Sequence, residues 1–291
     1  MKPAPFAYYR ARSVDEAVAL LSSLGEDAKV IAGGQSLVPM MNLRLARPTA
    51  LVDILAIPGL SYIHQDAASL RIGALTTHRA IERQSGLADG FALLPTAARW
   101  VGHYPIRTRG TFGGSIAHAD PSAEWCMLAR LYDAELVVVG SRGRRLIAAD
   151  DFFSGMFNTD LTPDELLVDV RLPRSFSRGA LHEFARRYGD FAIVAAAVGL
   201  DVVDGRCSNV RIVLGGVASR AERTPEAEDL LNGADVDPAA FAEAAEVAAS
   251  TVEPPGDIHG SSEYRRHLVR VLVRRALDEA TREKAVDGAR R

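Results

Sequence analysis

The sequence has few of the residues that build disulfide scaffolds or thiolate metal centres. Its 291 residues include two cysteines, Cys126 and Cys207, which form no spacing motif. This gives no sign of a disulfide framework, a Cys-based metal site or a set of iron–sulfur ligands, and it fits a reducing compartment. No group of His, Cys and Asp has metal-ligand spacing, so we expect no metal on this chain.

Long apolar runs and a strong net charge are also missing. No run approaches the roughly 20 apolar residues that span a bilayer, and residues 1–13 lack the apolar core of a secretory signal. The net charge of −3 argues against nucleic-acid backbone binding as the main role and leaves room only for a local basic patch. We therefore expect a soluble cytoplasmic protein that has no membrane span and binds no nucleic acid.

What the chain does have is an ordinary globular composition on a length sufficient for two or three modest domains. Its first part predicts a helix over residues 13–25, where Ser13 is a suitable N-cap, Glu16 has capping-box spacing and Gly25 is a stop signal. Short strands are predicted over 28–34 and 50–55. Residues 1–55 therefore form a small αβ unit.

A second αβ unit is predicted over residues 56–175. It begins with a strand that turns into a helix over 70–84 and continues with a helix over 90–102, in which Pro95 is awkwardly placed. A further helix is predicted from about Pro121, with Asp120 as its N-cap, because proline is harmless at the first helical position. Strands over 134–140 and 164–173 complete the unit.

The pattern changes after a polar link at residues 175–179. Strands are predicted over 180–187, 192–205 and 209–219, with Asp204-Gly205 as a hairpin signal between two β-branched runs. The remainder is predicted to be helical over 224–233, 237–250 and 261–282. The tail, residues 283–291, is expected to be frayed.

Two glycine-rich stretches carry the functional signal. The first is Ala32-Gly33-Gly34-Gln35-Ser36 and the second is Thr111-Phe112-Gly113-Gly114-Ser115. Glycine lets a ligand approach the backbone, successive amides in such a turn can bind an anion, and the dipole of a following helix adds to the attraction. Because each stretch also has a hydroxyl side chain, the two together can hold a pyrophosphate from both sides.

Either stretch alone is better read as a tight turn between packed elements. Neither has the G-x-G-x-x-G pattern of a dinucleotide-binding fold, and no P-loop lysine follows. No Gly-x-Ser-x-Gly motif is present either, so Ser36 and Ser115 are not candidate nucleophiles. It is the occurrence of two similar stretches in similar contexts that favours a phosphate site.

Four segments together resemble a known family: residues 31–48, 72–78, 111–125 and 186–198. They are similar to the FAD-binding medium subunit of molybdenum hydroxylases, of the carbon monoxide dehydrogenase and xanthine dehydrogenase type, and the likeness covers almost the whole chain in order. The resemblance implies an α+β, PCMH-type FAD-binding fold of two αβ subdomains, residues 1–55 and 56–175. It further implies a C-terminal domain over 176–291, with a three-stranded antiparallel sheet and a helical bundle.

The resemblance also implies how FAD is held. Ala32 to Ser36 and Thr111 to Ser115 would wrap its pyrophosphate, with Phe112 standing where relatives usually have Ile or Val. Glu124 would accept a hydrogen bond from a ribose or ribityl hydroxyl, the alternative being a surface glutamate. The remaining cofactor contacts would come from His118, the backbone at Leu167, Asp190 and Phe191.

Two of these residues have alternative interpretations, and two histidines outside the set have expectations of their own. Phe191 stands where close relatives have a tyrosine that shields the isoalloxazine ring, and the alternative is a core phenylalanine. Leu167 would be a core strand residue in any case. His182 aligns with a lysine of xanthine dehydrogenase, which puts that charge contact in doubt, and His78 is expected to cap a helix start or a turn.

By resemblance, the chain is a flavin-carrying electron-transfer subunit with no catalytic acid or base of its own. A small partner subunit would carry two [2Fe-2S] clusters and a large one the molybdenum cofactor, in a dimer of heterotrimers, and electrons would leave through FAD to an external acceptor. One alternative is a self-contained FAD-dependent oxidoreductase, which would need a substrate pocket with a base. The other is a nucleotide-binding scaffold module without redox chemistry.

Overall fold

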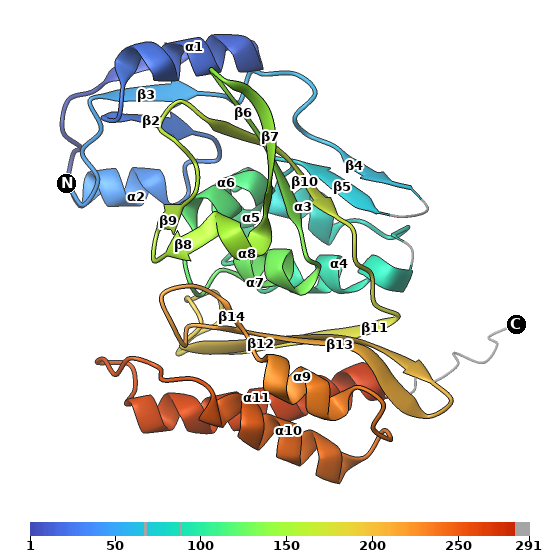
Figure 1. The fold of residues 1–291 in the computed structure, drawn as a ribbon. Helices are drawn as coiled ribbons and strands as arrows, with labels where there is room; N and C mark the ends of the chain where they lie inside the picture. Colours follow the sequence, from blue (N-terminus) through green and yellow to red (C-terminus); the bar gives the residue numbers. More distant parts are fainter. Residues whose placement is uncertain (67–68, 88, 283–291) are drawn as a thin grey trace, which may run out of the picture.

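The computed structural model describes residues 1–66, 69–87 and 89–282. Three main sheets are stacked along the molecule, with helices between the second and third sheets and beneath the third (Figure 1). Helices and strands therefore form a mixed α+β architecture, as predicted. The expected frayed tail lies outside the described residues.

The first sheet is parallel and has the order β1-β3-β2, formed by β1 (Ala7–Arg10), β2 (Ala28–Ile31) and β3 (Ala50–Asp53). Its helix α1 (Val14–Leu24) confirms the capping prediction, since Ser13 Oγ accepts from the Glu16 amide at 3.1 Å and Gly25 ends the helix. The Glu16 carboxylate accepts from the Arg12 amide at 2.7 Å. The buried face of α1 packs in a core that also takes side chains from the second sheet.

The second sheet is antiparallel, with the order β4-β5-β10-β6-β7. Its strands are β4 (Ile63–Gln65), β5 (Leu70–Gly73), β6 (Glu135–Gly140), β7 (Gly143–Ala148) and β10 (Leu166–Leu172). Between β5 and β6 run α3 (His78–Glu82), the short η1 (Asp89–Phe91), α4 (Leu93–Ala97), α5 (Tyr104–Arg109), α6 (Phe112–His118) and α7 (Glu124–Leu131). Between β7 and β10 lie α8 (Ala149–Phe152) and a small ribbon of β8 (Phe153–Gly155) and β9 (Asn158–Thr159).

The predicted start of one helix was wrong. We expected a helix from Pro121 capped by Asp120, but α7 begins at Glu124 after Ala123. The Asp120 carboxylate instead accepts from the Ser122 amide at 2.9 Å, and the Ala123 amide donates to the Asp120 carbonyl. This local turn satisfies the groups that a helical cap would have used, so the helix starts three residues later.

The third sheet is antiparallel and has the order β11-β12-β13-β14. Its long strands β11 (Arg178–Phe184), β12 (Val194–Val203) and β13 (Arg206–Gly215) are the three predicted strands, and the two-residue β14 (Glu222–Arg223) is added at the edge. Asp204 and Gly205 both have positive φ, +52° and +78°, which confirms the hairpin. One face of the sheet packs on α9 (Pro225–Leu231), α10 (Pro238–Ser250) and α11 (Ser262–Thr281).

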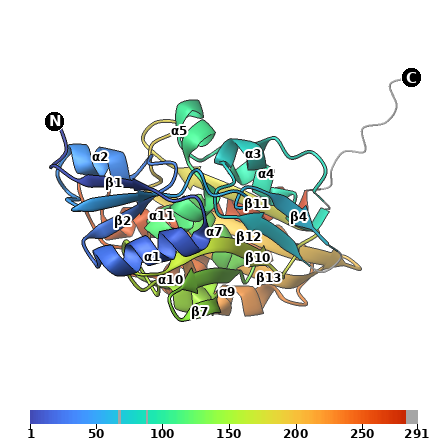
Figure 2. The ribbon, with the colours of Figure 1, turned by 90° about the horizontal axis from the view of Figure 1, so that it is seen from above.

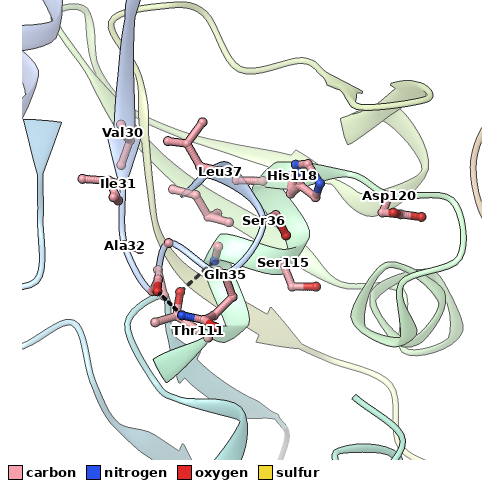
Figure 3. Close-up of a pocket in the computed structure, with 18 of the residues that line it drawn as sticks. Val30, Ile31, Ala32, Gln35, Ser36, Leu37, Thr111, Ser115, His118 and Asp120 are labelled. Carbon is pink, nitrogen blue, oxygen red and sulfur yellow. Dashed lines mark hydrogen bonds between the residues drawn. The ribbon is translucent and has the colours of Figure 1, made fainter. Parts of the chain in front are cut away.

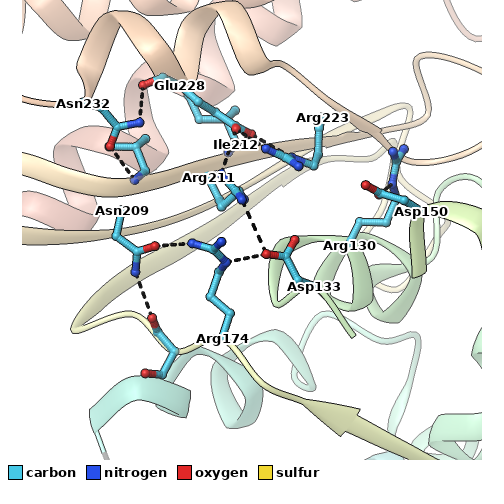
Figure 4. A network of polar contacts seen from close by, with 12 residues as sticks. Arg130, Asp133, Asp150, Arg174, Asn209, Arg211, Ile212, Arg223, Glu228 and Asn232 are labelled. Atoms are coloured by element: carbon cyan, nitrogen blue, oxygen red, sulfur yellow. Dashed lines mark hydrogen bonds and ion pairs between the residues drawn. The ribbon is translucent and has the colours of Figure 1, made fainter. Parts of the chain in front are cut away.

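The other face of this third sheet packs against α4 and α7 (Figures 1 and 2). A network of ion pairs joins α7 and its neighbours to the edge of the third sheet (Figure 4). Arg130 of α7 contacts Asp150 and Glu222, and the side chain of Asp133 accepts from Arg174 at 2.5 Å. The described helices include none that is long and apolar enough to cross a bilayer.

Candidate functional site

A cavity of about 680 Å³ lies where the three parts of the chain meet. Its wall takes residues from β2 and the loop that follows and from α6 (Figure 3). The start of α7 and the loop between β11 and β12 also contribute. It extends from Glu26 and Lys29 in the first sheet unit to Asp190 and Phe191 in the C-terminal part. This size and elongated lining fit a cofactor bound in an extended conformation.

The first glycine stretch is a true loop between β2 and α2 (Leu37–Asn42). Gly34 has φ +70°, a conformation that glycine adopts without strain. No amide from residue 33 to residue 36 donates to an acceptor in the described ranges of the chain. Four neighbouring amides beside a cavity are therefore available to an anion.

The second stretch differs from its prediction, because it is the first turn of a helix and not a loop. Thr111 caps α6 by accepting from the Gly114 amide at 3.2 Å. The Phe112 and Gly113 amides donate to the carbonyls of Thr76 and Ala74. The second stretch thus has few free amides for a phosphate, and its glycines serve close packing.

The two stretches lie close together, with the first packed against Arg109 and Gly110, which directly precede the second. A Cβ on Gly33 would lie 2.2 Å from the Arg109 carbonyl oxygen, and a Cβ on Gly114 would lie 3.8 Å from the Ala32 Cβ. Ser36 and Ser115 line the same cavity, and neither hydroxyl has a hydrogen bond within the described part of the chain. The geometry brings together a loop with free amides, a helix start that contains two glycines, and two serine hydroxyls that can donate hydrogen bonds.

All the predicted cofactor residues except Phe112 line this cavity. Phe112 is 1% exposed and its ring meets Trp125 edge-on at 5.0 Å, so its side chain belongs to the core. Phe191 is 70% exposed at the cavity wall, which excludes its alternative as a core residue. Leu167 is buried in β10 beside a bulge and contributes to the wall.

His78 does not have its predicted role. Thr77 caps α3 by accepting from the Ala80 amide at 3.1 Å, and His78 is buried at the cavity wall. Its Nδ1 accepts from Trp125 Nε1 at 2.9 Å. Burial first, and then the charge of Arg107, lowers the pKa of His78 to about 4. The imidazole is therefore neutral, with its proton on Nε2.

Two carboxyl groups and a histidine on one side of the cavity have shifted pKa values. Burial raises the pKa of Asp120, and burial raises the pKa of Glu124 to about 7 with a further contribution from Asp120. Burial lowers the pKa of His118, whose ring lies 4.9 Å from that of Phe157. Glu124 is therefore not the surface glutamate of its alternative interpretation, and the wall is less charged than its composition suggests.

Sequence reasoning missed the wall formed by residues 157–166. Phe157, Asn158, Thr162 and Glu165 line the cavity without any motif that marks them. The Glu165 carboxylate accepts from Arg145 at 2.7 Å and from the Thr162 amide at 2.8 Å, which fixes this segment. The hydrogen bond from Arg145 is the largest cause of the lowered pKa of Glu165. Burial, the second cause, acts in the opposite direction and raises it.

His182 lies away from the cavity. It projects from β11 toward α11, where Nε2 lies 2.8 Å from Glu279 Oε2. This placement is consistent with the expectation that His182 does not replace the charge contact made by the lysine of xanthine dehydrogenase. No group of three His, Cys, Asp or Glu side chains in the described segments is arranged to hold a metal ion.

The residues present fit FAD. The free amides of residues 33–36 suit a pyrophosphate, and this loop is held in place because Gly33 has no Cβ, which would lie 2.2 Å from the Arg109 carbonyl oxygen. The exposed Phe191 ring offers a face for a flavin at the far end.

Comparisons with known proteins show the family of the chain. Residues 4–175 match the FAD binding domain in molybdopterin dehydrogenase, and residues 179–280 match the CO dehydrogenase flavoprotein C-terminal domain. The chain is 40% identical to the nicotine 6-hydroxylase medium subunit of Paenarthrobacter nicotinovorans, covering 96% of this chain and 99% of that one. It is 37% identical to the carbon monoxide dehydrogenase medium chain of Hydrogenophaga pseudoflava, covering 96% and 98%.

Solved structures give the same result. A chain of quinoline 2-oxidoreductase from Pseudomonas putida 86 superposes with a TM-score of 0.92 at 39% identity, over 96% of this chain and 98% of that one. A chain of the carbon monoxide dehydrogenase of Hydrogenophaga pseudoflava superposes equally well, with a TM-score of 0.92 at 38% identity and the same coverage. This chain therefore belongs to the FAD-binding medium-subunit family of molybdopterin dehydrogenases and is an oxidoreductase subunit.

Proposed function

We propose that this chain carries FAD as the electron-transfer subunit of a molybdenum hydroxylase complex. Electrons would arrive from [2Fe-2S] clusters on a small partner subunit and leave to an external acceptor, while a large partner subunit holds the molybdenum cofactor. The observation that carries the proposal is that the two glycine stretches lie close together and line one cavity. We propose the cytoplasm as its location and a dimer of heterotrimers as its assembly.

The residues of this chain have distinct roles in the proposal. The amides of residues 33–36 bind the pyrophosphate, and Ser36 and Ser115 donate to its oxygens. The backbone at Leu167 would contact the flavin or the adenine, and the ring of Phe191, next to Asp190, would stack on the isoalloxazine. FAD, when bound, supplies the redox chemistry, so no residue here acts as a substrate acid or base.

The division of the chain follows the same scheme. We propose that residues 1–55 and 56–175 act as two FAD-binding subdomains, each with its own sheet, and that residues 176–291 form the third unit. Separate sheets over 7–53, 63–172 and 178–223 support these boundaries. Residues of all three units line the cavity, which supports a cofactor site shared between them.

A titration of the purified chain with FAD tests the proposal. Flavin fluorescence quenching should saturate with FAD and be weaker with FMN, and ADP should compete. The double variant Ser36→Ala/Ser115→Ala should bind FAD on the order of tenfold to a hundredfold more weakly, since two charge-assisted hydrogen bonds are lost. Ser250→Ala, an exposed serine of α10, is the matched control.

Two outcomes would count against the proposal. Equal affinity for FAD, FMN and ADP, with no reduction of the bound flavin by dithionite, would favour the scaffold alternative. FAD binding unaffected by the double variant would mean that the pyrophosphate lies elsewhere.

A further inference from the structure

The loop between β11 and β12, residues 185–193, brings the C-terminal part of the chain to one end of the cavity. Gly189 and Phe191 line the wall there, and the Phe191 ring is largely exposed. The base of the loop is closed by a hydrogen bond from the Ile193 amide to the Phe184 carbonyl at 2.8 Å. An exposed ring on such a loop keeps one position beside a ligand only if further contacts hold the loop.

Two residues of this loop contact a segment of the second sheet unit, residues 99–103. The Tyr188 hydroxyl donates to the Arg99 carbonyl at 3.0 Å, and the Tyr188 ring lies 6.3 Å from that of His103. Gly189 has φ +84° and lies so close to His103 that a Cβ on it would be 2.3 Å from the ring atom Cε1. The loop therefore rests on one carbonyl and one ring of the other unit.

The segment that receives the loop is itself held in place. Buried Arg107 donates from Nη1 to the Gly102 carbonyl at 2.8 Å and to the Val101 carbonyl at 3.3 Å, and it pairs with Glu82 at 3.0 Å. Val101 and Gly102 also line the cavity. His103 precedes α5 but makes no capping hydrogen bond with its side chain, so its ring is available for the contact with the loop.

We propose that Tyr188, Gly189 and His103 are positioning residues that fix the Phe191 ring against the flavin. This rests on the proposed function for the identity of the ligand, FAD. Phe191 supplies the stacking face, and the contact of the loop with residues 99–103 sets where that face lies. The surroundings of the flavin thus depend on a contact between two units of the chain and not on Phe191 alone.

Limited trypsin digestion of the full chain without ligand tests these contacts. Arg186 and Arg187 of the loop are exposed, so the cleavage rate after them rises when the loop is released more often. His103→Ala removes the ring from outside the cleaved segment and should raise this rate about threefold or more. Tyr188→Phe loses only the hydrogen bond to the Arg99 carbonyl and should change the rate in the same direction.

Tyr104→Phe, at an exposed tyrosine next to His103, is the matched control and should be cleaved at the wild-type rate. If neither His103→Ala nor Tyr188→Phe raises the rate above this control, the loop is not held by these contacts and the proposal is wrong. Because no FAD is present, this result is independent of the proposed function.

The spectrum of bound FAD tests the effect on Phe191. Gly189→Ala should change the absorption and fluorescence of the flavin in the same direction as Phe191→Ala, because the displaced loop no longer stacks the ring. Gly233→Ala is the matched control, since Gly233 has φ +86° and a Cβ there meets nothing within 4 Å. In the Phe191→Ala background, Gly189→Ala should change the spectrum no further, since both substitutions act through one ring.

Two results would overturn the positioning role. One is a flavin spectrum of Gly189→Ala that equals that of Gly233→Ala. The other is a Gly189→Ala effect that persists in full in the Phe191→Ala background, because the substitution would then act by another route. Absence of FAD binding to the wild type would refute the proposed function instead.

Discussion

Gly33 packs against the backbone carbonyl of Arg109 so closely that any side chain at residue 33 would collide with it. The collision partner is main chain and cannot swing away. Two segments far apart in the sequence can therefore lie this close only because residue 33 has no side chain. The position of the loop that presents the free amides depends on this contact.

Gly33→Ala should weaken FAD binding by at least about tenfold while the chain stays folded, because the loop must move away from α5 and its amides lose their alignment. Fluorescence titration and circular dichroism measure both effects. Gly155→Ala is the matched control, since a Cβ there meets nothing within 4 Å. An affinity equal to that of the control would show that the loop position does not matter.

Phe191→Ala should leave the free energy of unfolding within about 0.5 kcal/mol of the wild type, because the ring is 70% exposed. The spectrum and fluorescence of bound FAD should change, as the stacking face is lost. Phe241→Ala, at a buried ring of α10 that is 2% exposed, should cost about 3–5 kcal/mol and serves as the contrast. A large stability loss at Phe191 with an unchanged flavin spectrum would reverse this assignment.

Arg130→Met should destabilise the chain by about 1–3 kcal/mol, measured by urea unfolding. The guanidinium is buried and contacts Asp150, Glu222 and the Ala221 carbonyl, so it bridges α7 to the edge of the third sheet. Both carboxylates are partly exposed and can be rehydrated, which keeps the loss moderate. Arg142→Met, at an exposed turn, should change stability by less than about 0.5 kcal/mol.

The stability of the chain should fall as the pH drops from about 6.5 to about 4 through His78. Its folded pKa of about 4 lies below the unfolded value, so the unfolded state binds more protons in this window. At pH 4 the free energy of unfolding should be lower by roughly 3 kcal/mol because of this residue. His78→Gln should remove this part of the pH dependence.

Nuclear magnetic resonance provides the direct check on His78. Its imidazole should stay neutral at pH 5, with the proton on Nε2, while exposed His64 and His259 are the reference rings in the same spectra. A His78 that titrates near 6.5 would contradict the buried neutral assignment. Glu124 acts in the opposite sense, because its raised pKa contributes stability that is lost as the pH rises toward 7.

Local chemistry made several elements predictable. Ser13 and Gly25 bound the first helix, and Asp204-Gly205 joins β12 to β13, because capping and turn preferences depend on neighbouring residues. The β-branched runs on either side of this turn likewise predicted the strands β12 and β13. The resemblance also predicted a set of cofactor contacts, and all of these residues except Phe112 line the cavity.

The remaining features depend on contacts between distant segments. The Phe112 amide is taken by Thr76, and His78 is held by Trp125, and neither bond follows from local spacing. The start of α7 was missed because a short Asp120 turn competed with the helical cap. The wall at residues 157–166 has no motif because its position comes from sheet pairing and from Arg145.

The cavity wall draws on all three sheet units, so a ligand that fills it binds only when the three are docked. Its binding energy then adds to the stability of the docked arrangement through mass action, by about 2.7 kcal/mol at a free concentration a hundred times its dissociation constant. The melting temperature of the chain should therefore rise with the concentration of free cofactor. A cell that runs short of the cofactor would hold this chain in a form more easily opened and degraded.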